Sequence, residues 1–341
     1  MKNRLLFPII FPFIFPFIFP FIFSACSDFS GNEDEVEASL KPSTVTAQKE
    51  EETATTRTYY DLYGITFGNN TFVAVGKRGT VRYSSDNGST WDNGTRGTTS
   101  ELNEIAYGDS TFVTVGQSGT IRTSSDNGTT WSTGTTLETS TYEGVAYGNI
   151  LLADNTTHKA FVALGSSNVW KSIDNGSNWN QITTANLNDV AFGNSIFIGC
   201  GDDGAIETSD NGSNPWSSVT SGASEDLNGI TYGNNRFISV GDDGKLIKST
   251  DNGSTWGDVN SGVLNSYDLE SIAYGNNKFV GVGYKTVIVS SDNNSTSYTL
   301  TDTTLTFKDV TYGNGVFVAV GLGEIIYTST DGDTWTKVHG K

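Results

Sequence analysis

The chain has 341 residues, enough for one large β domain or two ordinary ones, and 35% of them are hydrophobic. Its formal net charge of -18 argues against nucleic acids and anionic lipid surfaces as partners. Glycine accounts for 39 residues, and Ser, Thr and Asn are also abundant, which indicates many short strands joined by turns. We therefore expect an all-β protein with a solvated acidic surface.

The N-terminal 25 residues have the composition of an export signal. Lys2 and Arg4 precede an apolar run at residues 5–23, in which proline recurs at every fourth position. Proline at that spacing removes helix hydrogen bonds, so we predict a signal peptide over residues 1–25 rather than a transmembrane helix. Phe23-Ser24-Ala25-Cys26 resembles a bacterial lipobox, which implies that Cys26 is lipidated. The resemblance also implies an outer-membrane lipoprotein at the bacterial cell envelope, and the alternative is an uncleaved or simply secreted form.

Residues 26–56 contain acidic clusters and almost no side chains to bury. Glu33-Asp34-Glu35 and Glu50-Glu51-Glu52 lie in this segment. Such a composition predicts a disordered tether, because it cannot bury enough apolar surface to offset the entropy of folding. The folded domain is therefore predicted over residues 57–341.

A stretch of eight residues recurs throughout this domain, first as Ser84-Ser85-Asp86-Asn87-Gly88-Ser89-Thr90-Trp91. Short side-chain oxygens can bond nearby amides, Asn-Gly tolerates positive φ, and the tryptophan can begin the next strand, so each octet predicts a hairpin turn. The fourth copy is read with an additional Pro215, the sixth has Asn294 for glycine, and the seventh is one residue shorter. The other copies are Ser124 to Trp131, Ser172 to Trp179, Thr208 to Trp216, Ser249 to Trp256, Ser290 to Tyr298 and Ser329 to Trp335.

These octets resemble the Asp-box, or BNR repeat, whose pattern is Ser-x-Asp-x-Gly-x-Thr-Trp. The resemblance implies that the octets are structural clasps on the face opposite a ligand site. The aspartates and tryptophans that carry it are Asp86, Trp91, Asp126, Trp131, Asp174, Trp179, Asp210, Trp216, Asp251, Trp256, Asp292, Asp331 and Trp335.

Three further strands precede each octet tryptophan, in the first copy at residues 62–67, 71–75 and 80–84. Trp91 and Trp335 are 244 residues apart over six intervals, which gives a mean period of about 41, as in four-stranded propeller blades. We therefore predict a seven-bladed β-propeller of four-stranded antiparallel blades. Each octet is placed in the hairpin between strands three and four.

Acidic residues near the starts of the first strands are the candidates for a ligand rim. They should lie where the blades meet the mouth of the central channel. A solvated rim is the alternative, and no catalytic residue, metal site or cofactor is predicted. The candidates are Glu104, Glu143, Asp189, Glu270 and Asp309.

Two other features were weighed as sites. Gly201-Asp202-Asp203-Gly204 lacks the oxygen spacing of a calcium loop, so we interpret it as a turn. The third repeat is lengthened at residues 149–159, which is either a functional loop or a neutral insertion.

Taken together, the repeats and the lipobox resemble the photosystem II stability/assembly factor family. That resemblance implies a non-catalytic platform, monomeric and anchored to the membrane, that binds a protein partner. A carbohydrate-binding protein or a glycoside hydrolase is the alternative. The face opposite the octets should discriminate, because stacked aromatics with facing acids favour a sugar and a broad shallow surface favours a protein.

Overall fold

In the computed structural model, residues 58–134, 139–151, 156–259, 267–290 and 298–341 are described. All of them belong to the unit Thr56–Lys341, so the predicted signal peptide, Cys26 and the tether lie outside the described residues. Asp292 of the sixth octet also lies outside them. Within these ranges, no helix has the length and apolar character needed to cross a membrane.

The first repeat folds into four consecutive antiparallel strands, which are β1 (Leu62–Gly68), β2 (Thr71–Gly76), β3 (Val81–Ser84) and β4 (Asp92–Asn93). A 3-10 turn, η1 (Lys77–Gly79), joins β2 to β3, and its counterparts are η2 (Gln117–Gly119), η3 (Asp202–Gly204) and η4 (Asp242–Gly244). The next four repeats follow the same order within their own sheets. Their strands are β5 (Leu102–Gly108), β6 (Thr111–Gly116), β7 (Ile121–Ser124), β8 (Ser132–Thr133), β9 (Tyr142–Leu151), β10 (Thr157–Gly165), β11 (Asn168–Ser172), β12 (Asn180–Thr183), β13 (Asp189–Gly193), β14 (Ile196–Cys200), β15 (Ile206–Ser209), β16 (Ser217–Ser218), β17 (Leu227–Gly233), β18 (Arg236–Gly241), β19 (Leu246–Ser249) and β20 (Gly257–Asp258).

The all-β propeller of antiparallel four-stranded units is confirmed, but the predicted number of seven blades is wrong. Within the described residues, the strands form six hydrogen-bonded sheets, of which five have four strands and one has six. The sixth and seventh repeats share the six-stranded sheet, ordered β21 (Leu269–Gly275), β22 (Lys278–Ser290), β23 (Tyr298–Gly313), β24 (Val316–Gly321), β25 (Ile326–Ser329) and β26 (Thr336–His339).

Two long strands merge these repeats into one sheet. β22, with 13 residues, covers the second and third strands of the sixth repeat, and β23, with 16 residues, covers the fourth strand of the sixth repeat and the first strand of the seventh. Tyr284 of β22 pairs with Thr306 of β23, and Thr286 pairs with Asp302. The pairing shifts register at Lys285, whose φ of 57° is close to the 55° of Arg78 in the turn η1, so it is the unbroken strand β23 that joins the two repeats.

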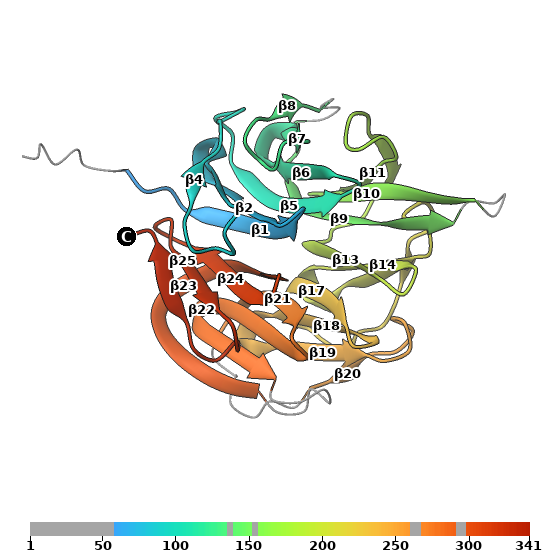
Figure 1. Cartoon of the computed structure of the whole chain (residues 1–341). Coiled ribbons are helices and arrows are strands. Elements are labelled where there is room, and N and C mark those ends of the chain that lie inside the picture. Colours follow the sequence, from blue (N-terminus) through green and yellow to red (C-terminus); the bar gives the residue numbers. More distant parts are fainter. Residues whose placement is uncertain (1–57, 135–138, 152–155, 260–266, 291–297) are drawn as a thin grey trace, which may run out of the picture. The chain divides into compact units, whose positions relative to one another are not determined.

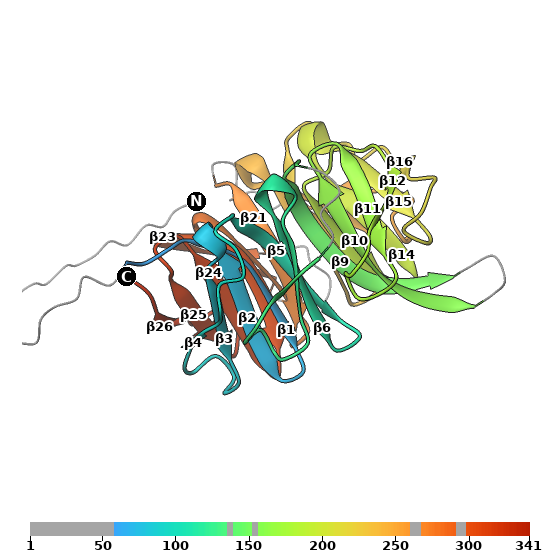
Figure 2. The same ribbon diagram turned by 90° about the horizontal axis from the view of Figure 1, so that it is seen from above.

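The sheets follow one another around a common centre in sequence order, and the last lies beside the first (Figures 1 and 2). Contacts between glycine and aromatic rings connect the first strands of neighbouring repeats. A Cβ atom on Gly68 would lie 2.0 Å from the Tyr107 ring, so only glycine permits this approach. Gly313 in the last repeat has the same relation to Phe67 in the first, because its Cβ would lie 2.0 Å from that ring. The glycine–aromatic contact that joins consecutive repeats therefore also joins the last repeat to the first.

Apolar packing and a buried ion cluster complete the closure. Leu62 and Phe72 of the first repeat pack with Val318 and Ile326 of the last, and all four side chains are fully buried. The Glu324 carboxylate, also inaccessible to solvent, accepts hydrogen bonds from the Arg82 guanidinium and from the backbone N–H of Tyr60. In the part of the chain that the structure describes, side-chain contacts join the first and last sheets, and no strand of one sheet pairs with the other.

Candidate functional site

The octets form the connections between the third and fourth strands of the repeats. In the first copy, Asp86 Oδ1 accepts hydrogen bonds from Ser84 Oγ at 2.7 Å and from Thr90 N at 2.9 Å, and Asp86 Oδ2 accepts one from Thr90 Oγ1 at 2.6 Å. Gly88 N donates to Ser84 Oγ, and Trp91 Nε1 donates to Gly88 O at 3.0 Å. The donors of Thr90 stabilise the ionised carboxylate and hold the pKa of Asp86 below its ordinary value.

The same clasp recurs in four other octets. The serine, carboxylate, glycine N–H and indole N–H have equivalent partners in each of them. In the seventh octet, one residue shorter, Asp331 Oδ1 accepts from Asp333 N and Thr334 N. The residues of these clasps include Asp126 with Trp131, Asp174 with Trp179, Asp251 with Trp256, and Asp331 with Trp335.

The fourth octet corrects the sequence alignment. Ser209, not Thr208, takes the buried serine position, because it pairs with Phe197 as Ser84 pairs with Phe72. Asn211 then replaces the clasp aspartate, and its Oδ1 accepts a hydrogen bond from Ser213 N at 2.8 Å. Asp210 therefore does not occupy the position predicted for it. Counted from Ser209, this octet has eight residues, so Pro215 is not an additional residue.

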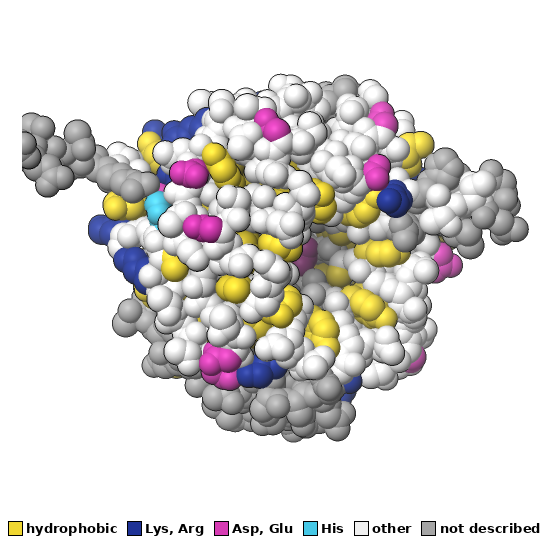
Figure 3. All heavy atoms as spheres, in the orientation of Figure 1, with side chains coloured by type: hydrophobic (Ala, Val, Ile, Leu, Met, Phe, Trp, Pro, Cys, Tyr) yellow, Lys and Arg dark blue, Asp and Glu magenta, His cyan; other side chains and the backbone are white. Residues whose placement is uncertain are grey.

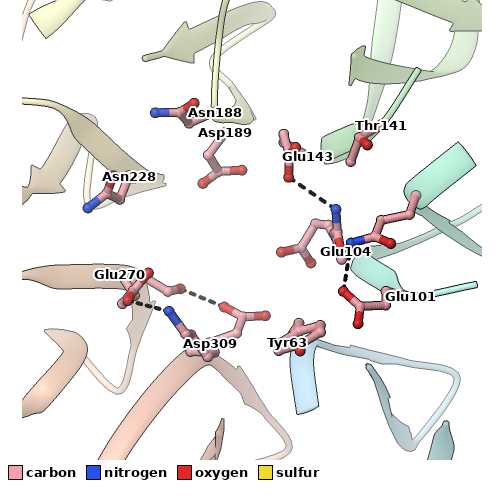
Figure 4. A pocket seen from close by; sticks show the side chains of 14 residues that line it. Tyr63, Glu101, Glu104, Thr141, Glu143, Asn188, Asp189, Asn228, Glu270 and Asp309 are labelled. Carbon is pink, nitrogen blue, oxygen red and sulfur yellow. Dashed lines mark hydrogen bonds and ion pairs between the residues drawn. The ribbon is translucent and has the colours of Figure 1, made fainter. Parts of the chain in front are cut away.

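All five predicted rim acids line one cavity of about 530 Å³ at the centre of the ring (Figure 4). The starts of the first strands and the segments that precede them form its wall, including Glu101 and Thr141. The octets lie at the other end of these strands, since Asn69, just after β1, donates to the octet residue Asn127 at 2.8 Å. Figure 3 shows a hollow at the centre of the ring, in which Asp or Glu side-chain atoms are visible.

The five acids occupy two successive positions of the first strand. Glu104, Asp189 and Asp309 share one position, which is glycine in the first, third and fifth repeats and Ser271 in the sixth. These three carboxylates point into the same space from different sheets (Figure 4). Glu143 and Glu270 occupy the preceding position. We call Glu104, Asp189 and Asp309 the inner acids, and Glu143 and Glu270 the outer acids.

The inner acids are held by backbone N–H groups of their own and neighbouring repeats. Asp309, only 7% exposed, accepts from Ile65 N at 2.6 Å through Oδ2, and from Ser271 Oγ and Val310 N through Oδ1. Asp189 likewise accepts from Val190 N at 2.7 Å and from Ile230 N at 2.9 Å. Glu104 Oε1 accepts from Ile105 N at 2.7 Å. Asp189 and Asp309 therefore connect adjacent repeats, and all three inner acids line the cavity.

Removal from water makes the ionised form of these acids unfavourable. Burial raises the pKa of Asp189 to about 6 and that of Asp309 to about 7. Burial, together with the negative charges of Asp309 and Asp189, raises the pKa of Glu104 well above its ordinary value. At neutral pH the three groups therefore oppose one another's ionisation, and a nearby positive charge would relieve this repulsion.

The outer acids have polar partners and remain nearer to solvent. Lys308, the one basic residue among the described residues of the cavity wall, forms an ion pair with Glu270. Asn103 Nδ2 donates to Glu143 Oε2 at 3.0 Å, and Gln117 Nε2 donates to Glu101 Oε2 at 2.7 Å. Burial also raises the pKa of Glu143. Sequence reasoning missed Glu101 and Lys308, although Lys308 aligns with the two outer acids.

The other features weighed as sites do not line the axial cavity. Asp202 lies in η3, where its carboxylate oxygens accept from Asn186 Nδ2 at 3.1 Å and Asn188 Nδ2 at 2.9 Å. The lengthened third repeat extends the β9–β10 hairpin, which projects from the ring (Figures 1 and 2). Across the described ranges, no three His, Cys, Asp or Glu residues are grouped so as to hold a metal ion.

Comparison with known proteins identifies the fold. No protein-family model matches the chain, and no curated protein matches it. The solved structure "YCF48 bound to D1 peptide" is similar at 16% identity and a TM-score of 0.63, over 80% of this chain and 92% of that chain. YCF48 from Cyanidioschyzon merolae is similar at 15% identity and a TM-score of 0.64, over 81% and 97%. The computationally designed Ika8 protein is similar at 12% identity and a TM-score of 0.57, over 79% and 83%. At these identities the likeness establishes a propeller fold.

Proposed function

We propose that this chain is a non-catalytic binding or assembly platform that receives a positively charged group of a protein partner in its axial cavity. Among the residues that the structure describes, the cavity wall carries six carboxylates, at Glu101, the inner acids and the outer acids, against the single amine of Lys308. That imbalance is the observation that carries the proposal. A Lys or Arg side chain entering the cavity would offset the repulsion among the inner acids.

The proposal extends to the cellular context that the sequence predicts. The chain would be exported, lipidated at Cys26 and held as a monomer at the outer membrane by the segment 26–56. YCF48, which has a similar fold, has been solved with a peptide of D1. This supports a peptide segment as the kind of ligand that such a propeller accommodates.

A carbohydrate ligand is the second candidate, because several acids face one another and the pKa of Asp309 rises to about 7. Two observations favour the protein partner instead. Tyr63 is the single aromatic residue among the cavity-lining residues, so stacking platforms for sugar rings are missing from this wall. Both oxygens of Asp309 already accept hydrogen bonds from the protein, which makes it a poor proton donor to a glycosidic oxygen.

Titration calorimetry with matched peptides tests this function. An acetylated, amidated Gly-Gly-Lys-Gly-Gly peptide should bind to the purified domain, and the same peptide with norleucine in place of lysine should not. Glu143→Gln combined with Glu270→Gln should weaken binding roughly tenfold, because two carboxylate charges near the mouth are removed. Glu207→Gln, outside the cavity, is the matched control. Equal affinity for the two peptides, or binding of xylo- and cello-oligosaccharides instead, would contradict the proposal.

A further inference from the structure

A second polar groove lies beside the axial cavity and has the opposite charge. It has a volume of about 480 Å³, and none of the described residues that line it is acidic. Those residues are Tyr60, Arg78, Arg96 and residues 97–99. The Cζ atoms of Arg78 and Arg96 lie 5.8 Å and 4.8 Å from the centroid of the Tyr60 ring. Both guanidinium groups are therefore gathered at one aromatic side chain by cation–π attraction. We call this feature the Tyr60 groove.

The local backbone fixes the segments that carry the two arginines. Arg78 lies in η1 with φ of 55°, a left-handed conformation that is uncommon for a residue other than glycine. The next residue, Gly79, packs so closely on the following loop that a Cβ there would lie 2.1 Å from Thr98 O. The loop bearing Arg96 is thereby held against the turn bearing Arg78. Three segments that contact one another therefore form the groove: Tyr60 before β1, the turn η1, and the loop that follows β4.

Neither guanidinium is used in an ion pair within the part of the chain that the structure describes. Carboxylates within ion-pair distance accompany Arg82 and several lysines there, but not Arg78 or Arg96. The neighbouring Lys77 forms an ion pair with Asp61, in which Nζ and Oδ2 are 3.2 Å apart. In a chain with 38 acidic residues, two arginines converging without a carboxylate form an unusual local excess of positive charge. Their planar N–H donors suit a carboxylate group.

The two cavities are close enough for one ligand to occupy both. Thr99 lines the Tyr60 groove and Glu101 lines the axial cavity. Two residues of extended chain span at most about 7 Å, so these walls are near neighbours. We propose that the Tyr60 groove binds a carboxylate of the same partner segment that places its basic group in the axial cavity. The partner motif is then a basic residue and an acidic residue a few positions apart, an inference that rests on the proposed function.

Four acetylated, amidated peptides separate the two sites. The parent is Lys-Gly-Gly-Glu, and the others replace Lys by norleucine, Glu by Gln, or both. Wild-type protein should bind the parent about fivefold more tightly than the Gln peptide, as expected for an exposed charge pair. Arg78→Asn combined with Arg96→Gln should abolish that difference, while Arg236→Gln, which removes an arginine elsewhere, should preserve it. Asparagine is chosen at position 78 because it tolerates positive φ.

The outcomes distinguish the two proposals. If the glutamate effect depends on the arginines but lysine has no effect, the carboxylate site stands and the cationic role of the axial cavity fails. If the glutamate effect survives in the double variant, or disappears equally in the Arg236 control, the carboxylate site is wrong. Inorganic phosphate that binds more tightly than the parent peptide would also overturn it in favour of a phosphate site. Should the double variant not fold by circular dichroism, Tyr60→Leu provides the second test, with the same expected loss.

Discussion

The surroundings of the carboxylates favour the ionised form in the octet turns and the protonated form in the axial cavity. In the octets, Asp86 is exposed, but three hydrogen bonds from Ser84 and Thr90 hold its charged form. In the cavity, Glu104 has one backbone donor and two acidic neighbours that oppose its charge. The pKa of Asp86 is accordingly lowered, whereas that of Glu104 is raised.

This difference indicates which carboxylates serve the fold and which are available to a ligand. A turn carboxylate surrounded by donors is satisfied within its own octet. A buried cavity carboxylate beside other acids retains an unmet requirement for positive charge. Asp309 accepts three hydrogen bonds, as Asp86 does, yet its pKa is raised, so burial and neighbouring negative charge separate the candidate site from the architectural aspartates.

The largest effect is expected from Asp86→Ala in the first octet. It removes the acceptor for three donors at once and should lower the free energy of unfolding by about 2 kcal/mol at pH 7. Because the folded pKa is lowered, the carboxylate stabilises the fold above its unfolded pKa, and that contribution is lost as pH falls through the folded value. Urea unfolding of variant and wild type should therefore converge towards pH 2. A variant as stable as wild type at pH 7 would contradict the role of the clasp.

Glu104→Gln should raise the free energy of unfolding, by about half the amount by which Asp86→Ala lowers it. Since the folded pKa of Glu104 is raised, wild-type stability falls as pH rises from the unfolded value through the folded one. Glutamine keeps an acceptor for Ile105 N and removes the charge, so the variant should be about 1 kcal/mol more stable at pH 8 and no more stable at pH 4. Thermal unfolding at both pH values measures this difference. Destabilisation at pH 8 would mean that the charge of Glu104 is satisfied.

Several features of the fold and site followed from the repeat alone. The recurrence of short strands and Asn-Gly turns specifies antiparallel sheets, and equivalent positions in a ring must face a common axis. For that reason Glu104, Asp189 and Asp309 could be placed in one cavity from their positions in the strands. The repeat does not specify how sheets are divided, because that depends on whether the chain bends. From Tyr298 to Gly313 it continues as the single strand β23, and the two repeats merge.

Other features depend on contacts outside the repeat. Tyr60 precedes the first strand and Arg96 follows the fourth, so no periodic spacing connects them with Arg78. The fourth octet was misaligned for a different reason. Asp210 and Asn211 are adjacent, and the repeat pattern favours the aspartate, but the buried position of Ser209 selects the asparagine.

The smallest expected effect comes from restoring a carboxylate to that octet. Asn211→Asp would present a charged acceptor to Ser213 N and to Ser209 Oγ, which now bond the amide oxygen at 2.8 Å and 3.5 Å. Pro215 stands where the first octet has Thr90, so the amide and hydroxyl donors of that position are missing and only part of the clasp can return. We expect a gain of about 0.5 kcal/mol in the free energy of unfolding at pH 7. Asp210→Asn, one residue away, should leave stability unchanged. If Asp210→Asn changed stability and Asn211→Asp did not, Asp210 would be the clasp residue and the register given by Ser209 would be wrong.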